Sequence, residues 1–215
     1  MTEGAAGLPA AWAALVRAPG APAVGERLLA AYAEPHRRYH DQQHLAEVLE
    51  AVDRLAPAVE EPADLLAVRL AAWFHDAVYD TTAPPGATEE SSARLAEQLL
   101  PSLGLARSVV ARVAALVRAT ATHDGATGTD ADVLFDADLS ILAREPERYT
   151  AYRAGVRTEY AHVPDADFRR GRRAILQGLL DRPRIYRTAA AYDAWETRAR
   201  AQVSAELAEL AELTR

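Results

Sequence analysis

The sequence predicts an all-α protein that folds as a single domain. Nearly every segment of the 215 residues spaces its apolar residues three and four positions apart, as the buried face of a helix requires. Alternating β-branched runs, which would indicate strands, are missing. The length suits one well-filled core, and no change in composition divides residues 1–215. We therefore expect a bundle of about eight to ten helices.

Prolines and a capping residue divide the first half of the chain. Proline interrupts a helix interior, so Pro9, Pro19 and Pro22 bracket a short first helix, and Pro35 ends the second. Asp41 is suited either to cap the next helix or to stand as an acid in its first turn. The expected helices lie around Trp12 and Leu15, over residues 24–34, over 41–55, and from Pro62 to beyond His75 and Asp76.

Two loops and five further helices are expected in the second half. Two prolines and a glycine make residues 81–88 a loop, and Thr88 then caps the next helix. Residues 124–130 form a second loop. The expected helices cover residues 89–100, 106–122, 149–160, 165–180 and 189–213.

The last helix has one continuous apolar face. We expect this face either to pack against the rest of the chain or to form the seam of a homodimer. Its residues are Tyr192, Trp195, Ala199, Val203, Leu207 and Leu210.

The composition excludes several kinds of chemistry. The chain has no cysteine, which rules out disulfides, thiolate zinc sites, iron–sulfur clusters and cysteine nucleophiles. All 24 basic residues are arginine, so Schiff-base chemistry and a Walker-type phosphate loop, which need lysine, are also excluded. Metal ions, histidine, carboxylates, hydroxyls and arginine remain.

Charge and hydropathy bear on partners and location. The net charge of −7 argues against binding a nucleic-acid polymer or an anionic membrane surface. No apolar run approaches the roughly 20 residues of a membrane span. The N-terminus is acidic and does not resemble a signal peptide, so the expected location is the cytoplasm.

Histidine and aspartate recur in apolar surroundings at three places in the chain. His75 and Asp76 are adjacent within LAAWFHDAVYD, and neither is stable in a core without a partner. Together they could chelate one divalent ion. His40 and His44 lie four residues apart upstream, on one face of a helix. Downstream, Asp136 and Asp138 lie two residues apart, so only one of them can face the same ion.

Five strings together resemble one family. They are YHDQQH, WFHDAVYD, TEESSA, TATHD and DADLSIL. In this order they are similar to the HD superfamily of metal-dependent phosphohydrolases, within a bacterial branch of predicted phosphohydrolases, over about residues 25–210. The first and last strings also resemble those of cyclic-nucleotide phosphodiesterases. The resemblance implies a helical bundle of the HD-domain type.

The resemblance also implies a ligand set for a metal ion. The metal ligands would be His44, His75, Asp76 and Asp138. Asp136 would then be a cap or would orient a ligand histidine. The ion would be Mn, Fe, Co, Ni or Zn, with Mg less suited to imidazole ligands.

Further residues acquire roles from the same resemblance. His40 would protonate the leaving oxygen, and Glu89 or Glu90 would hold the attacking water, although acids are also favoured in any first helical turn. His123 could bind a second metal, contact substrate or cap a helix. Arg157, Arg172 and Arg173 would clamp a phosphate or pair with acids.

The expected activity is hydrolysis of a phosphate ester or anhydride of a small molecule, with nucleotides as the first class to test. Two alternatives stay open. An HD-type di-iron oxygenase would usually need two histidines between the HD pair and the final aspartate, where this chain has only His123. A non-catalytic binding module, in which the metal only staples helices together, would keep all four ligands.

Overall fold

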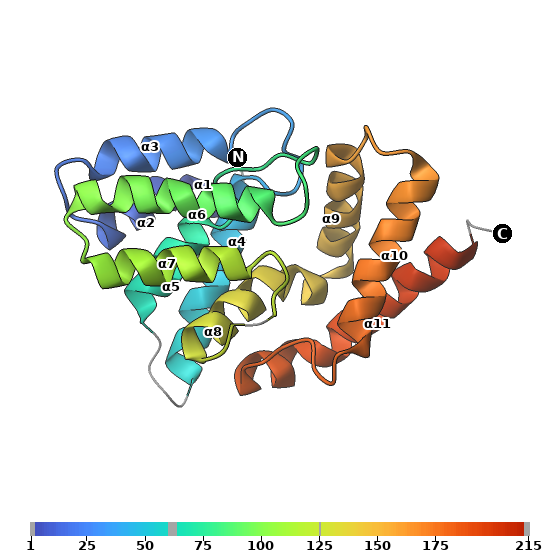
Figure 1. The fold of residues 1–215 in the computed structure, drawn as a ribbon. Coiled ribbons are helices and arrows are strands. Elements are labelled where there is room, and N and C mark those ends of the chain that lie inside the picture. Colours follow the sequence, from blue (N-terminus) through green and yellow to red (C-terminus); the bar gives the residue numbers. More distant parts are fainter. Residues whose placement is uncertain (1–2, 60–63, 125, 213–215) are drawn as a thin grey trace.

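The computed structural model describes residues 3–59, 64–124 and 126–212, and within these ranges the chain is helical without any strand. The predicted all-α class is confirmed. The helices are α1 (Glu3–Ala6), α2 (Leu8–Leu15), α3 (Ala21–Ala31), α4 (Gln42–Leu55), α5 (Leu65–Phe74), α6 (Ala87–Leu99), α7 (Arg107–Ala119), α8 (Thr129–Asp138), α9 (Pro146–Glu159), α10 (Asp165–Asp181) and α11 (Ala189–Glu212), with 3-10 helices η1 (Ala56–Ala58), η2 (Leu100–Leu103) and η3 (Leu139–Ala143) (Figure 1). No helix in these described ranges is both long enough and apolar enough to cross a bilayer.

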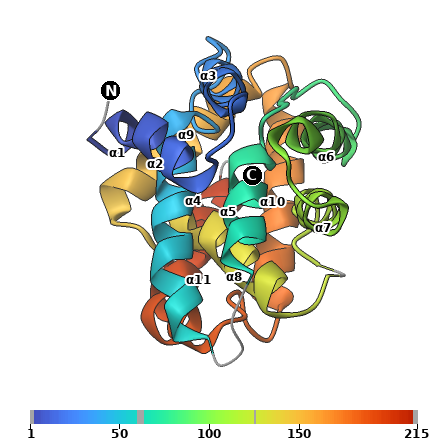
Figure 2. The same cartoon turned by 90° about the vertical axis from the view of Figure 1, so that its left-hand side faces the viewer.

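Helix α5 lies at the centre of the fold because all of its residues except Arg69, which pairs with Asp53, are apolar. Its consecutive residues Leu70, Ala71 and Ala72 are all fully buried. A helix with no polar face must be covered all round, and α5 contacts α4, α6, α7 and α8 (Figure 2). The end of α5 is therefore enclosed by several other elements.

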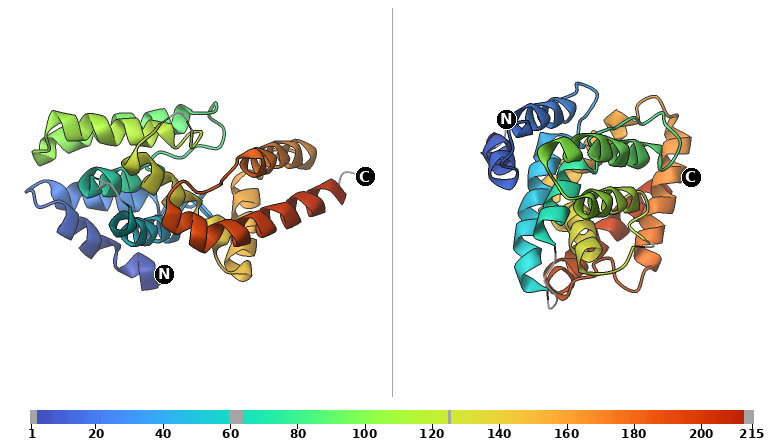
Figure 3. Two further views of the ribbon diagram at one scale, coloured as in Figure 1. Left: turned by 90° about the horizontal axis from the view of Figure 1, so that it is seen from below. Right: turned by 60° about the vertical axis from the view of Figure 1, so that its left-hand side comes forward.

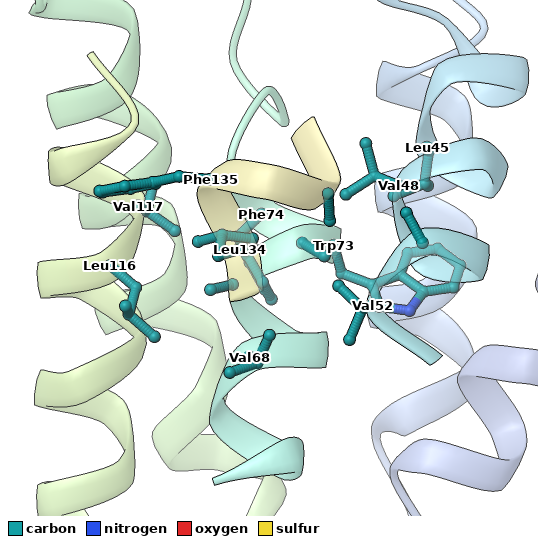
Figure 4. Packing of buried hydrophobic residues seen from close by; sticks show 14 of the residues in the cluster. Leu45, Val48, Val52, Val68, Trp73, Phe74, Leu116, Val117, Leu134 and Phe135 are labelled. Carbon is teal, nitrogen blue, oxygen red and sulfur yellow. The ribbon is translucent and has the colours of Figure 1, made fainter. Parts of the chain in front are cut away.

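The core forms where apolar side chains of α4, α7 and α8 meet those of α5 (Figure 4). The side chains that meet there come from α4, α5, α7 and α8, and they include Leu45, Val48, Val52, Val68, Trp73, Phe74, Leu116, Val117, Leu134 and Phe135. Packing of these side chains fixes the relative positions of α4, α5 and α8.

The remaining helices surround this core. Helices α6 and α7 pack against each other, and both contact α5. Helices α2 and α3 form another contacting pair, joined to the core where the ring of Trp12 meets that of Trp73 edge-on at 5.2 Å. Towards the C-terminus, α10 contacts α11, and these two helices extend beyond the central bundle (Figures 1 and 3).

Several predicted boundaries were wrong. Helix α6 begins at Ala87, so Thr88 lies within its first turn and is not its cap. The residue before it is Gly86, whose φ of 80° favours glycine. The second predicted loop ends before Thr129, where α8 begins. Pro22 stands in the first turn of α3, where proline is tolerated, and Pro62 lies outside the described residues.

The apolar face of α11 is covered by the chain itself. Ala199, Val203 and Leu210 are buried, and Trp195 is half-buried against the core. Helix α11 lies on η3 and α10. Packing within the chain accounts for this face, and the homodimer stays an untested prediction.

Candidate metal centre

Three helix ends bring the predicted metal ligands together. His44 lies in the first turn of α4, where the carboxylate of Asp41 accepts hydrogen bonds from the backbone N–H groups of Gln43 and His44. Asp41 is thus the N-cap, one of its two predicted positions. Asp138 is the last residue of α8.

The predicted position of the histidine–aspartate pair within its helix was wrong. The sequence placed His75 and Asp76 in the middle of a helix, whereas α5 ends at Phe74 and His75 is its C-cap. The backbone turns directly after the buried part of α5. This turn allows the side chains of His75 and Asp76 to approach the same point. In a continuing helix, two adjacent side chains would point about 100° apart.

The nitrogens and oxygens of the four residues are closely spaced. His44 Nε2 lies 3.1 Å from His75 Nε2, and both nitrogens lie near Asp76 Oδ2, at 3.6 and 3.1 Å. The same two nitrogens lie 3.2 and 3.6 Å from Asp138 Oδ1. Two histidines and two acids that the sequence grouped thus lie close together, and their role as metal ligands stays a prediction.

The separations within a group of three of these residues suit one common ion; Asp138 stands outside that group, although its Oδ1 faces both histidine nitrogens. Ligand atoms about 2.1 Å from a metal lie roughly 3.0 Å apart at right angles and roughly 3.4 Å apart in a tetrahedron. The donor atoms of His44, His75 and Asp76 all lie within 4.8 Å of one another, as joint ligation needs. Two imidazoles with two carboxylates form a mixed N/O set, which fits a first-row divalent metal.

Burial distinguishes the histidines from the acids. The side chains of His44 and His75 are 3% and 1% exposed, whereas those of Asp76 and Asp138 are 17% and 14% exposed. His75 Nδ1 lies 2.8 Å from the carbonyl oxygen of Ala72, to which it donates, so Nε2 is the nitrogen that would bind a metal once it has lost its proton. The imidazoles are therefore the buried part of the cluster, and the acids are its more exposed part.

Electrostatics couples the four groups strongly. Burial alone would lower the pKa of His75, but the negative charges of Asp76 and Asp138 outweigh burial and raise it. Burial would raise the pKa of Asp138, but His75 and the hydrogen bonds from His123 and His44 lower it. The protein without metal thus holds protons between these histidines and acids, and metal binding must displace them.

His123 joins the same cluster. Its Nε2 lies 2.7 Å from Asp138 Oδ2, the carboxylate oxygen opposite the one that faces His44 and His75. His123 has a φ of 50°, unusual for a residue with a side chain, and the guanidinium of Arg187 donates to its carbonyl oxygen. Of the three predicted roles, this position suits that of a second metal ligand, and the hydrogen bond also lets His123 orient Asp138, a role that was not predicted.

Asp136 faces away from the cluster, as its two-residue offset from Asp138 predicts. Its carboxylate accepts hydrogen bonds from the backbone N–H groups of Arg187 and Thr188 and from the Thr188 hydroxyl. It fixes the start of α11 and bonds no ligand histidine. Burial raises its pKa to about 6, against the effect of these donors.

His40 is held by a buried carboxylate that the sequence did not single out. Glu159 Oε2 lies 2.7 Å from His40 Nδ1 and accepts a hydrogen bond from the Tyr79 hydroxyl at 2.9 Å. Glu159 Oε1 accepts three more, from the backbone N–H groups of Arg38, Tyr39 and His40. Despite burial, these contacts lower the pKa of Glu159 to about 2. Because 119 residues separate Glu159 from His40, spacing could not reveal the pair.

The ring of His40 lies close to the cluster. Its centroid is 5.7 Å from that of His44, and the Tyr79 ring stacks on its other side at 4.4 Å. With Nδ1 donating to Glu159, Nε2 is the nitrogen left to exchange a proton with a bound molecule.

Arg37 is a second residue that sequence reasoning missed. It is 3% exposed, and its guanidinium donates to the backbone carbonyl oxygens of His40, Asp76 and Ala77 at 3.0, 2.7 and 3.4 Å. It also lies over the rings of Tyr32 and Tyr79. Arg37 thus ties the segment before α4 to the segment after α5.

The two candidate glutamates differ in their partners. Glu90 accepts hydrogen bonds from Arg94 and from Arg118, which lower its pKa to about 2. Glu89 is half-buried and accepts a hydrogen bond from the Thr88 hydroxyl. Since Glu90 is occupied by two guanidinium groups, Glu89 is the better candidate to orient a water.

The three candidate arginines do not share one environment. Arg172 is buried and bonds Glu206 and the hydroxyl of Tyr152. Arg157 bonds Asp165 and backbone carbonyl oxygens that follow α9. Arg173 is exposed on α10. Arg157 and Arg172 already have acidic partners, in line with the ion-pair alternative.

A buried polar atom without a partner marks the surroundings of the cluster. The Tyr39 hydroxyl accepts and donates no hydrogen bond within the described chain, although Tyr39 is only 3% exposed. The Tyr39 ring centroid lies 4.8 Å from that of His44, and its hydroxyl is within the electrostatic influence of Asp138. Such an atom normally has a partner, so a water or other small ligand beside the cluster fits it.

Two surface hollows lie elsewhere. One, of about 450 Å³, is lined by residues of α2 and α4, among them Leu8 and Gln43. The other, of about 310 Å³, is lined by residues of α4, the segment around η3, and α11, among them Arg54 and Trp195. Neither contains a predicted site residue.

No protein-family model, no curated protein and no solved structure matches this chain. Assignment of a function therefore depends on the chemistry of the side chains themselves.

Proposed function

We propose that this protein is a metal-dependent phosphohydrolase of the HD type that cleaves a phosphate ester or anhydride of a small molecule. The observation that carries the proposal is the spacing of 3.1 to 3.6 Å between the donor atoms of His44 or His75 and those of the facing acids, with His40 beside them. The resemblance of the five sequence strings supports the same activity.

The donor set fits a divalent ion, with two neutral imidazole nitrogens and two carboxylate oxygens. A bound Mn, Fe, Co, Ni or Zn ion would lower the pKa of a coordinated water and polarise a phosphoryl oxygen. The residues of this chain would hold that ion between the buried imidazoles and the more exposed acids Asp76 and Asp138.

His40 would supply a proton to the leaving oxygen. The Glu159 carboxylate fixes Nδ1 as a donor and stabilises a positive charge on the imidazole, so the proton leaves from Nε2. Glu89 would orient the attacking water as a hydrogen-bond acceptor. Both roles require these side chains to act on substrate, which a metal that merely staples helices together would not need.

The substrate class follows from charge and composition. A net charge of −7 disfavours a nucleic-acid polymer, so a small phosphorylated molecule is the expected substrate, with nucleotides first.

The di-iron oxygenase alternative gains one ligand from His123, which contacts Asp138. No further histidine lies between residues 76 and 138.

A nucleotide panel with added Mn²⁺ tests the proposal. We expect release of phosphate or pyrophosphate from at least one member, with His75→Ala losing both bound metal and turnover. His40→Ala should keep the metal and lose turnover by about 100-fold or more. His36→Ala is the matched control, since His36 is an exposed histidine whose Nε2 bonds the Tyr79 carbonyl oxygen and lies 3.8 Å from the carboxylate of Glu34.

Two results would count against the proposal. No turnover by the metal-loaded protein across all substrates and metals would favour the staple, in which His75→Ala lowers only the melting temperature. An oxygen-dependent optical band after aerobic iron loading, without phosphate release, would favour the oxygenase.

A further inference from the structure

His123 is held in a backbone conformation that most residues avoid. Among the described residues other than glycine, it alone has a positive φ, at 50°, which is unfavourable for a residue with a Cβ atom. In this conformation it closes the turn after α7, and its Nε2 lies 2.7 Å from Asp138 Oδ2. A strained conformation of this kind persists only where the surrounding contacts hold it.

The guanidinium of Arg187 supplies such contacts. Arg187 lies 64 residues further along the chain, in the segment before α11, and its Nη2 donates to the carbonyl oxygen of His123 at 2.8 Å. Its Nη1 donates to the carbonyl oxygen of Ala126 at 2.8 Å and to Asp132 Oδ1 at 3.2 Å. One side chain therefore binds both the backbone after α7 and the first turn of α8.

The ring of Phe135 contacts both the arginine and the imidazole. The Arg187 guanidinium lies over this ring, 4.7 Å from its centroid, and the His123 ring meets it in a T-shaped arrangement at 5.4 Å between centroids. Phe135 and Asp138 are three residues apart on α8, so they share a helix face. Phe135 thus supports the imidazole where it reaches Asp138.

The backbone that carries Arg187 is itself fixed. Asp136 on α8 accepts a hydrogen bond from the N–H of Arg187 at 2.8 Å. Glu196 on α11, which is buried, accepts from the N–H groups of Ile185 and Tyr186 at 3.1 and 3.2 Å. Because two acids from different helices hold this segment, the guanidinium extends from an anchored backbone.

We infer that Arg187 is a positioning residue of the candidate metal centre, which directs the His123 imidazole onto Asp138. Asp138 Oδ2 contacts His123, whereas its Oδ1 faces His44 and His75. A hydrogen bond that fixes one oxygen of a carboxylate also orients the other, and loss of such an outer partner typically weakens metal binding by about 10- to 100-fold. The inference rests on the proposed metal-dependent function, and Arg187 acts on Asp138 only through His123.

Manganese affinity, measured by calorimetric titration, is the first test. Arg187→Met keeps the length of the side chain but removes its donors, and should weaken manganese binding by about 10-fold. His123→Ala should weaken it at least as much, and the double variant should bind no more weakly than His123→Ala, because the two residues act in series. Arg184→Met is the matched control, since Arg184 is an exposed arginine of the same segment that lies over the Tyr192 ring, and its affinity should be unchanged.

Nuclear magnetic resonance of the metal-free protein is the second test, and it needs neither metal nor substrate. The contact with Asp138 should protect the His123 Nε2–H from exchange with water, which gives an imidazole N–H resonance that is absent from His123→Ala. This resonance should disappear in Arg187→Met and remain in Arg184→Met. The urea midpoint of each variant is measured as well, and Arg187→Gln, which keeps one amide group as donor, replaces Arg187→Met if the latter does not fold.

The outcomes separate the inference from the proposed function. Persistence of the resonance in Arg187→Met, or its absence from wild type, overturns the inference. In a wild type that binds manganese, an unchanged affinity of Arg187→Met or additive losses in the double variant also overturn it. Loss of the resonance in Arg187→Met of a protein that binds no manganese supports the positioning of His123 and overturns the proposed metal centre.

Discussion

Replacing Glu159 by glutamine is expected to separate the proton donor from the metal centre. The substitution keeps the size of the side chain and one carbonyl oxygen, which can still accept from the backbone N–H groups of residues 38–40. Its amide nitrogen, however, would then face two donors, His40 Nδ1 and the Tyr79 hydroxyl, which now bond Glu159 Oε2. His40 should lose its fixed tautomer.

The magnitude follows from the lowered pKa of this carboxylate. Hydrogen bonds and the nearby imidazole lower the pKa of Glu159 from 4.5 to about 2, despite its burial. A shift of this size corresponds to about 3 kcal/mol of folding free energy at neutral pH. Because the folded pKa lies below the unfolded value, this contribution is complete above about pH 5 and disappears as the pH falls towards about 2.

The free energy of unfolding in urea is measured at pH 7 and at pH 3. Manganese affinity and phosphate release are measured at pH 7. Glu159→Gln should lose about 3 kcal/mol at pH 7, less at pH 3, and about 100-fold in turnover, with unchanged manganese affinity. Tyr79→Phe, which removes one of the two donors to Oε2, should lose only about 1 kcal/mol. Wild-type stability and turnover in Glu159→Gln would refute the positioning role.

Three further substitutions test other parts of the site. His75→Ala should weaken manganese binding by more than about 100-fold, measured by calorimetry, and unchanged affinity would remove His75 from the ligand set. Arg37→Met should lower the free energy of unfolding, measured in urea, by about 3 kcal/mol, because the carbonyl oxygens of His40, Asp76 and Ala77 would lose their donor. Asp136→Leu should destabilise the start of α11 by about 3 kcal/mol without changing metal content, and loss of metal would show that Asp136 supports the ligands.

The sequence predicted those parts of the protein that depend on local pattern. Apolar spacing gave the all-α class, and Asp41 was identified as a candidate cap of α4 from its type and place. His75 and Asp76 could be singled out because such residues are costly in an apolar segment without a partner. The resemblance of the five sequence strings to a known family then added His44 and Asp138 to the set.

What the sequence could not predict depends on contacts between distant segments. Arg37 and Glu159 each form hydrogen bonds with backbone groups of a distant segment. Because every residue type has a backbone N–H or carbonyl group, the sequence of that segment gives no sign that the bond will form. The sequence predicted either a phosphate or an acid as the partner of Arg172, and only the fold brings Glu206 beside it. The end of α5 before His75 was missed because its apolar run continues through the turn.

X-ray absorption of the cobalt-loaded protein would test the metal centre most directly. We expect one ion per chain with a mixed nitrogen and oxygen shell containing two imidazoles, reduced to one imidazole in His44→Ala. An oxygen-only shell, or no stoichiometric binding, would contradict the proposal that these four side chains hold a single cation.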